Sequence, residues 1–127
     1  DKMLKLEIEK TKEIENINLM RILQEMTTIH NNNFHNKVNE NYFREIFLSK
    51  QYDLYCLFNI RDKSDGKNYE IKKITEKMGK NENISFGYIV FYDTIYSLDL
   101  FEIAIDVQYQ GKGFGNKLLE KSRNDII

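Results

Sequence analysis

Hydrophobic residues recur along the chain with two different periods, which predicts short strands and amphipathic helices. Leu4, Leu6 and Ile8 alternate with charged residues, which predicts a strand with one buried face. The next hydrophobic residues have helical spacing and predict a helix with Thr11 in its N-cap region and its end in the polar residues 30–33. They are Ile14, Ile17, Leu19, Ile22, Leu23 and Met26.

A second helix and a buried strand are predicted in the middle of the chain. Residues 40–48 fit a short helix that Asn39 caps, with Tyr42, Phe43, Ile46 and Phe47 on one side. Residues 52–60 are rich in β-forming residues and nearly continuous in hydrophobic ones, which predicts a strand buried on both faces.

The last third of the chain predicts two strands, a glycine-rich loop and a helix. Residues 84–92 and 96–105 fit strands joined by a tight hairpin at residues 93–94. A helix is expected from Asn116 to the end of the chain. The fold class is therefore α/β or α+β, within a single domain over residues 1–127.

Residues 61–83 look unlike a core segment because charged residues dominate them. Their few hydrophobic residues, Ile71, Ile74 and Met78, fit a helical stripe, so a short helix is one interpretation. We expect this segment to be a polar insertion on the surface, and a functional recognition element is the alternative.

Composition narrows the function classes. The chain has 19 Lys and Arg against 20 Asp and Glu, and this balance argues against a nucleic-acid-binding protein. Its single cysteine, Cys56, excludes an intrachain disulfide and a multi-cysteine zinc site, and its apolar neighbours predict a core position. The longest apolar runs are about five residues, too short to cross a membrane. The first ten residues lack the apolar segment of a secretory signal, so a cytoplasmic protein is expected.

Gly111, Gly113 and Gly115 stand between a predicted strand and a predicted helix, where many folds bind phosphate. The spacing fails the Walker A pattern, because Asp106 stands where its first glycine would be. It also fails the dinucleotide pattern G-x-G-x-x-G, which would need glycine in place of Asn116.

Residues 110–115 match a third pattern: Gln or Arg, two residues, Gly, one residue, then Gly or Ala. With the flanking residues 100–106 and 118–120 in register, the chain resembles the GCN5-related N-acetyltransferase superfamily. It is most similar to the branch that acetylates the N-terminal alanine of ribosomal proteins. The resemblance is strong over residues 84–121, fair over residues 4–60 and absent over the insertion.

The resemblance implies a mixed, mostly antiparallel sheet flanked by helices, and a transferase that uses acetyl-CoA as co-substrate. The expected acceptor is a primary amine, by analogy a protein N-terminal α-amine such as that of a ribosomal protein, with a small-molecule amine still open. Backbone groups of the last predicted strand would pair with the pantetheine arm, and amides of the loop would hold the pyrophosphate. These residues are Ile103, Ala104 and Ile105, followed by Gln110, Gly111, Lys112, Gly113, Phe114, Gly115 and Asn116.

The sequence departs from the family pattern in three places. Val107 replaces a usual proline, and the turn that shapes the acceptor site reads Phe34-His35-Asn36-Lys37. Relatives continue past the loop helix with a strand, a helix and further strands, whereas this sequence stops at Ile127. The resemblance therefore implies that the C-terminal part of the fold, with the main acid and base groups, is missing. The rival function is that of a non-catalytic acyl-CoA-binding module, or of an inert half-domain that a partner chain completes. The exposed apolar edge of the last strand would make the chain prone to aggregation or dimeric through strand exchange.

Three further residues are candidates for acceptor chemistry. Asp99 corresponds to a general base in histone-acetylating relatives, and the alternative is a solvated carboxylate at a hairpin end. By strict alternation Glu102 faces the opposite side from Asp99, as a contact of the substrate amine or as a structural residue. Phe34 is a candidate for the wall of the acceptor pocket. His30 and His35 have no third ligand near them in sequence, so no metal site is predicted.

Overall fold

The computed structural model describes residues 16–59, 69–79 and 83–126, so the predicted strand at residues 4–8 lies outside the described part. Its elements form an α+β fold, as expected. The four strands make one antiparallel sheet in the order β2-β1-β3-β4. In chain order the elements are α2 (Ile17–Asn33), α3 (Asn41–Leu48), β1 (Tyr52–Asn59), β2 (Tyr69–Lys73), β3 (Ser85–Asp93), β4 (Leu98–Ile105), a 3₁₀ turn (Val107–Tyr109) and α4 (Phe114–Ile126).

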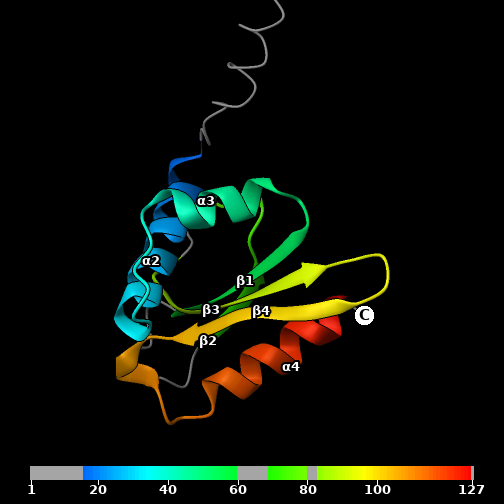
Figure 1. Ribbon diagram of the computed structural model, residues 1–127. Helices are drawn as coiled ribbons and strands as arrows, with labels where there is room; N and C mark the ends of the chain where they lie inside the picture. Colours follow the sequence, from blue (N-terminus) through cyan, green and yellow to red (C-terminus); the bar gives the residue numbers. More distant parts are fainter. Residues whose placement is uncertain (1–15, 60–68, 80–82, 127) are drawn as a thin grey trace, which may run out of the picture.

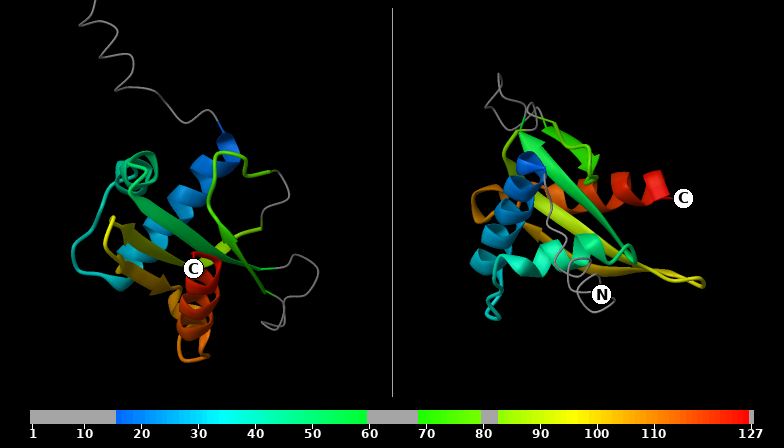
Figure 2. Two further views of the ribbon diagram at one scale, coloured as in Figure 1. Left: turned by 90° about the vertical axis from the view of Figure 1, so that its right-hand side faces the viewer. Right: turned by 90° about the horizontal axis from the view of Figure 1, so that it is seen from above.

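The sheet lies between two layers of helix (Figures 1 and 2). Helices α2 and α3 cover one face and α4 covers the other. In β1, Leu54 and Cys56 pack toward α2 and α3, whereas Tyr55 and Leu57 pack toward α4. Because alternate side chains enter two separate cores, the strand is apolar at nearly every position, and the predicted burial on both faces is confirmed.

The helix ends differ from the expected ones by a few residues. Asn16, and not Thr11, caps α2: its Oδ1 accepts the amide protons of Asn18 at 2.9 Å and Leu19 at 3.2 Å. Glu40 occupies the N-cap position of α3 and its side chain makes no capping hydrogen bond. Asn39, one residue earlier, accepts the amide proton of Asn41 through its Oδ1 at 2.9 Å.

Two predictions near the C-terminal third also need adjustment. Helix α4 begins at Phe114, two residues before the expected start. The hairpin between β3 and β4 turns over residues 94–97, where the Thr94 amide donates to the Ser97 carbonyl at 2.8 Å. The tip of this hairpin projects beyond the helices (Figures 1 and 2), and Ile95 is 93% exposed there.

The prediction of a polar surface insertion is wrong for the part of residues 61–83 that the structure describes. Residues 69–73 form β2, which pairs with β1 at one edge of the sheet. Ile74 and Met78 come after β2 in the sequence and pack into the core, where they are only 4% and 6% exposed. The predicted helix with a hydrophobic stripe is wrong as well. Ile71 lies in the edge strand β2, and Ile74 and Met78 lie in the non-helical segment that follows it. Residues 61–68 and 80–82 lie outside the described part.

The core position predicted for Cys56 is confirmed, and it carries a testable consequence. Burial raises the pKa of its thiol from 9.0 to about 12, partly opposed by a hydrogen bond with Ser85. The folded chain therefore keeps the thiol proton that the unfolded chain loses above pH 9, and stability from this group falls as the pH rises toward 12. At pH 8 we expect a chromogenic disulfide reagent to label Cys56 only after urea unfolds the chain; fast labelling without urea would contradict this burial.

Candidate functional site

The glycine loop is held in place by the first residue of its own pattern. Gln110 Nε2 donates to Asn33 Oδ1 at 2.6 Å and to the Ile105 carbonyl at 2.9 Å, and Asn33 Nδ2 also donates to that carbonyl at 3.1 Å. Gly111 and Gly113 have φ of +78° and +83°, a backbone conformation that other residues rarely adopt. The side chain of Gln110 therefore shapes the loop by joining the ends of α2 and β4.

The glycine loop is followed directly by the first turn of α4, which begins at Phe114. The Phe114 side chain is 4% exposed and packs edge-on against Phe86 at a ring-centroid distance of 5.1 Å, so only its backbone can meet a ligand. The first amides of a helix have no acceptor within that helix, and the helix dipole adds positive potential there. Gly115 is helical, and a Cβ built on it meets nothing within 4 Å. Neither backbone conformation nor packing within the described residues requires glycine at this position.

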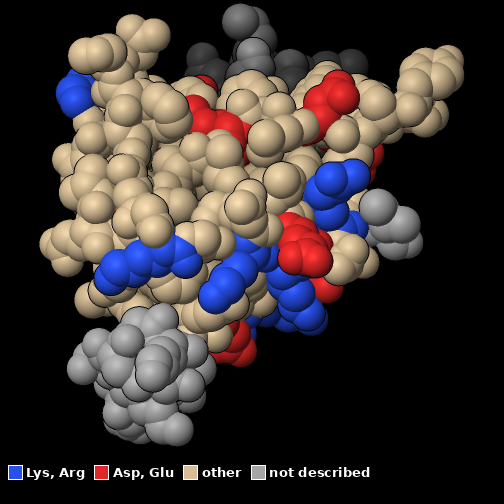
Figure 3. Space-filling view, turned by 90° about the horizontal axis from the view of Figure 1, so that it is seen from below, with Lys and Arg blue, Asp and Glu red and all other residues tan. Residues whose placement is uncertain are grey.

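Lysine side chains flank this loop. Lys112, within the loop, has its Nζ 5.7 Å from the centroid of the Tyr109 ring. Lys117, one turn into α4, has its Nζ 5.3 Å from the centroid of the Tyr69 ring. Asn116 is exposed in the same first turn. Figure 3, which views the molecule from the side of α4, shows Lys and Arg gathered on this face with acidic residues among them. Loop and lysines together can attract an anion.

Ile103, Ala104 and Ile105, at the end of β4, differ in whether their backbone groups are open to a ligand. Ala104 is buried on the side of α2, whereas Ile103 and Ile105 pack partly into the core on the side of α4. The Ile105 carbonyl already accepts from Gln110 and Asn33, so it does not have a free acceptor toward a ligand. Ile103 lies two residues earlier, so its backbone N–H and C=O groups point away from β3, as those of Ile105 do. β4 is an edge strand of the sheet formed by the described residues, so Ile103 has backbone groups open to pairing.

A β-bulge in β4 overturns the expected orientation of Glu102 and Asp99. Glu102 pairs with Val90 and Leu100 pairs with Phe91, so Phe101 is an extra residue between them. Asp99 pairs with Tyr92, which lies two residues from Val90 and therefore on the same face. Both carboxylates thus face the α2 side, and the prediction of opposite faces is wrong because strict alternation ends at the bulge. Asp99 is exposed near the hairpin and accepts a hydrogen bond from Ser97 Oγ at 3.2 Å.

Glu102, in contrast, belongs to a buried polar cluster with His30 and Tyr88. Its Oε2 accepts from the Tyr88 hydroxyl at 2.6 Å and lies 3.1 Å from His30 Nδ1. His30 Nε2 contacts the Asn36 carbonyl at 3.0 Å, so the histidine also holds the turn after α2. Burial and the neighbouring Glu102 raise the pKa of Tyr88, which keeps its hydroxyl protonated as a donor. The cluster connects α2, β3 and β4 through side chains alone.

Aromatic rings surround this cluster. Phe34, the candidate wall residue, has its ring centroid 4.7 Å from that of His30 and is 37% exposed. The Tyr42 ring lies 5.4 Å from His30, and burial, followed by the charge and hydrogen bonding of Glu102, raises the pKa of its hydroxyl. The structure therefore brings Phe34 and Glu102, 68 positions apart in the sequence, to the same histidine.

Sequence reasoning missed His30 and Tyr88 as partners of Glu102. One signal was present: His30 lies four residues after Met26, so it continues the buried stripe of α2. A polar ring on an apolar stripe needs a buried partner. No comparable signal marks Tyr88, which stands among hydrophobic residues in β3.

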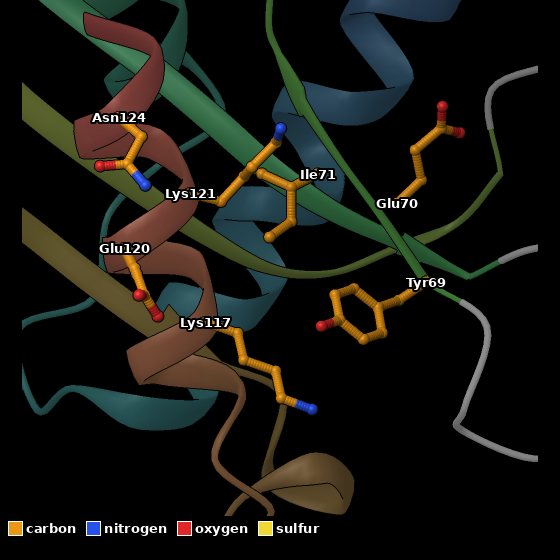
Figure 4. Close-up of a pocket in the computed structure, with 7 residues that line it drawn as sticks. All are labelled: Tyr69, Glu70, Ile71, Lys117, Glu120, Lys121 and Asn124. Carbon is orange, nitrogen blue, oxygen red and sulfur yellow. The ribbon is translucent and has the colours of Figure 1, made fainter. Parts of the chain in front are cut away.

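The described residues contain no metal site and no helix that could span a membrane, but they do form a groove. Within them no three His, Cys, Asp or Glu side chains are placed to hold a metal ion. No helix in the described ranges has the length and apolar character needed to cross a membrane. A groove of about 630 Å³ lies between β2 and α4, and Lys117, Lys121 and Glu120 line it with Tyr69 and others (Figure 4). None of the sequence-predicted site residues lines this groove.

The described site thus has two parts at opposite ends of the β4 segment from Glu102 to Ile105. The glycine loop and its lysines can hold an anionic group, and the Glu102 cluster can exchange a proton or receive a cation. Comparison of the chain with protein-family models, with curated proteins and with solved structures gave no match.

Proposed function

We propose that the chain is an acetyl-CoA-dependent N-acetyltransferase whose acceptor is a primary amine, with a protein N-terminal α-amine as the acceptor class. The glycine loop at the start of α4 is the observation that carries the proposal. Its glycines at 111 and 113 have positive φ, and its glycine at 115 faces open space without a structural need for it. A ligand that approaches the backbone closely accounts for that third glycine, because a side chain would occupy the ligand's place.

The residues present fit the diphosphate end of acetyl-CoA. Amides of the first turn of α4 would donate to its oxygens, and Lys112 and Lys117 would add positive charge. Backbone groups of Ile103 on the open edge of β4 would pair with an amide of the pantetheine arm, as an added strand pairs with a sheet edge. Acetyl-CoA supplies an activated acyl group when bound.

The cluster around Glu102 fits the acceptor. A primary amine is protonated at neutral pH and lacks the lone pair that attack requires, so a carboxylate near the acyl site would bind it and remove a proton. The rings of Phe34 and Tyr42, which lie next to His30, would form an apolar wall of the acceptor site. The preference for an α-amine over a small-molecule amine rests on the resemblance of residues 100–120 to the ribosomal-protein-alanine branch.

Calorimetry with acetyl-CoA and a thiol-release assay with a peptide panel test the proposal. We expect acetyl-CoA to bind, and free thiol to appear only with peptides that carry a free α-amine. The matched control is the same peptides with a blocked α-amine and a free lysine. Absence of acetyl-CoA binding overturns the proposal, and binding without thiol release favours a non-catalytic acyl-CoA-binding module.

A further inference from the structure

Hydrogen bonds around His30 determine where its protons must lie. The Asn36 carbonyl can only accept, so His30 Nε2, 3.0 Å away, carries a hydrogen. On the other side, Nδ1 lies 3.1 Å from Glu102 Oε2. A bare Nδ1 facing an ionised carboxylate at this distance would bring two lone pairs together in a buried site, which is unfavourable. The deprotonated pair therefore lacks a hydrogen between Nδ1 and Oε2 and has a place for one proton there.

Tyr88 allows this pair to lose and regain that proton. Its hydroxyl lies 2.6 Å from Oε2 and 3.3 Å from Nδ1, within reach of both acceptors. After the shared proton leaves, the hydroxyl can donate to either atom. No buried side-chain nitrogen or oxygen in the described part of the chain lacks a hydrogen-bond partner. Because the hydroxyl has one hydrogen, it stabilises the deprotonated pair only in part, and the atom left without a donor favours the return of the proton.

Glu102 is the member of the cluster that a ligand can reach. Its side chain is 14% exposed, against 7% for His30, and Tyr88 is fully buried. Glu102 also lies on the edge strand of the described sheet, three residues before the last residue of β4. A proton taken up from outside therefore enters at the carboxylate and reaches the imidazole behind it.

We propose that His30 and Glu102 share one proton and act together as the acid–base unit toward the acceptor amine, with Tyr88 as a positioning residue. This role rests on the proposed acetyl transfer. Glu102 contacts the ammonium group and removes one proton from its nitrogen, which keeps the lone pair. That proton comes to lie between Oε2 and Nδ1. The pair changes from one negative charge to none while the ammonium loses its positive charge.

Other titratable groups face this pair from each element around it. Tyr42 of α3 lies beside His30 and Glu102, and Tyr88 of β3 lies behind them. Tyr52 of β1 acts electrostatically on Tyr42. The raised pKa values of Tyr42 and Tyr88 keep both hydroxyls neutral, so neither tyrosine competes with His30 and Glu102 for the proton of the amine.

Nuclear magnetic resonance of the histidine rings tests the shared proton without any activity. The chain has two histidines, so His35→Asn assigns the signals of exposed His35 and leaves those of His30. We expect His30 Nε2 to stay protonated throughout, and Nδ1 and the Glu102 carboxyl carbon to titrate with one common midpoint. A His30 ring protonated only at Nδ1, or two independent midpoints, overturns the shared proton.

Glu102→Gln is the decisive variant, and Glu45→Gln, at an exposed position of α3, is its matched control. In Glu102→Gln we expect the midpoint of the His30 ring signals to differ from that of the natural chain, because its carboxylate partner is gone. In Glu45→Gln the midpoint should not move. An unchanged midpoint in Glu102→Gln contradicts the proposal.

Kinetics then separate the acid–base role from the proposed function itself. Glu102→Gln should lower kcat/KM for the amine about 100-fold or more and flatten the acid side of its pH profile, with acetyl-CoA affinity unchanged. An unaltered pH profile overturns the acid–base role. If the natural chain neither binds acetyl-CoA nor transfers acetyl, the proposed function and the role toward the amine fail together, and the resonance data decide the shared proton alone.

Discussion

Replacing Ile74 with alanine will lower the free energy of unfolding by about 2–5 kcal/mol, the usual cost of truncating a buried isoleucine. Ile74 is 4% exposed and directly follows β2. Its amide donates to the Leu54 carbonyl at 2.8 Å, so the backbone is fixed and the core cannot collapse easily into the space left behind. Urea unfolding followed by circular dichroism measures the change.

Ile95→Ala is the matched control, because this isoleucine is 93% exposed at the tip of the β3–β4 hairpin. Its stability should stay within about 0.5 kcal/mol of the natural chain. Equal stability of the two variants would show that the segment after β2 does not belong to the core. A charged surface insertion at residues 61–83, as the sequence alone predicts, requires that equality, so the pair of variants discriminates between the two descriptions.

The sequence predicts β1 and β3 well and misses β2, for a physical reason. Residues of β1 and β3 enter cores on both faces and are therefore apolar almost throughout. β2 has five residues and lies at the sheet edge, so Glu70 and Lys72 are accommodated where solvent reaches them. Short edge strands carry little hydrophobic periodicity, and pairing with β1, not local pattern, determines this one.

In the candidate site, too, one part can be predicted from the sequence and the other cannot. The glycine loop can be found from sequence because its residues are contiguous and its spacing is characteristic. The contact of His30 with Glu102 spans 72 positions, and no local pattern encodes it. The bulge at Phe101 changes the face of every side chain beyond it, so alternation could not place Glu102 and Asp99 correctly.

Gly115→Asp will weaken acetyl-CoA binding more than about 100-fold and will slightly raise the stability of the chain. The carboxylate would stand in the first turn of α4, where the proposed diphosphate binds, and juxtaposed like charges cost several kcal/mol. Gly113 is a poorer position for this test, because its φ of +83° strains any other residue whatever the ligand. At position 115 the Cβ meets nothing within 4 Å, so the fold accepts it.

Stability and affinity should therefore move in different directions. An acidic residue in the first helical turn is favourable to the helix dipole, and the loss of glycine favours the helix, by about 0.3–1 kcal/mol each. Gly115→Asn, nearly the same in shape but uncharged, separates charge from size and should lose at least about tenfold less affinity than Gly115→Asp. Calorimetric titration and thermal unfolding of both variants give the two quantities. If Gly115→Asp binds acetyl-CoA as tightly as the natural chain does, the loop does not hold the diphosphate, and the proposed function loses the observation on which it rests.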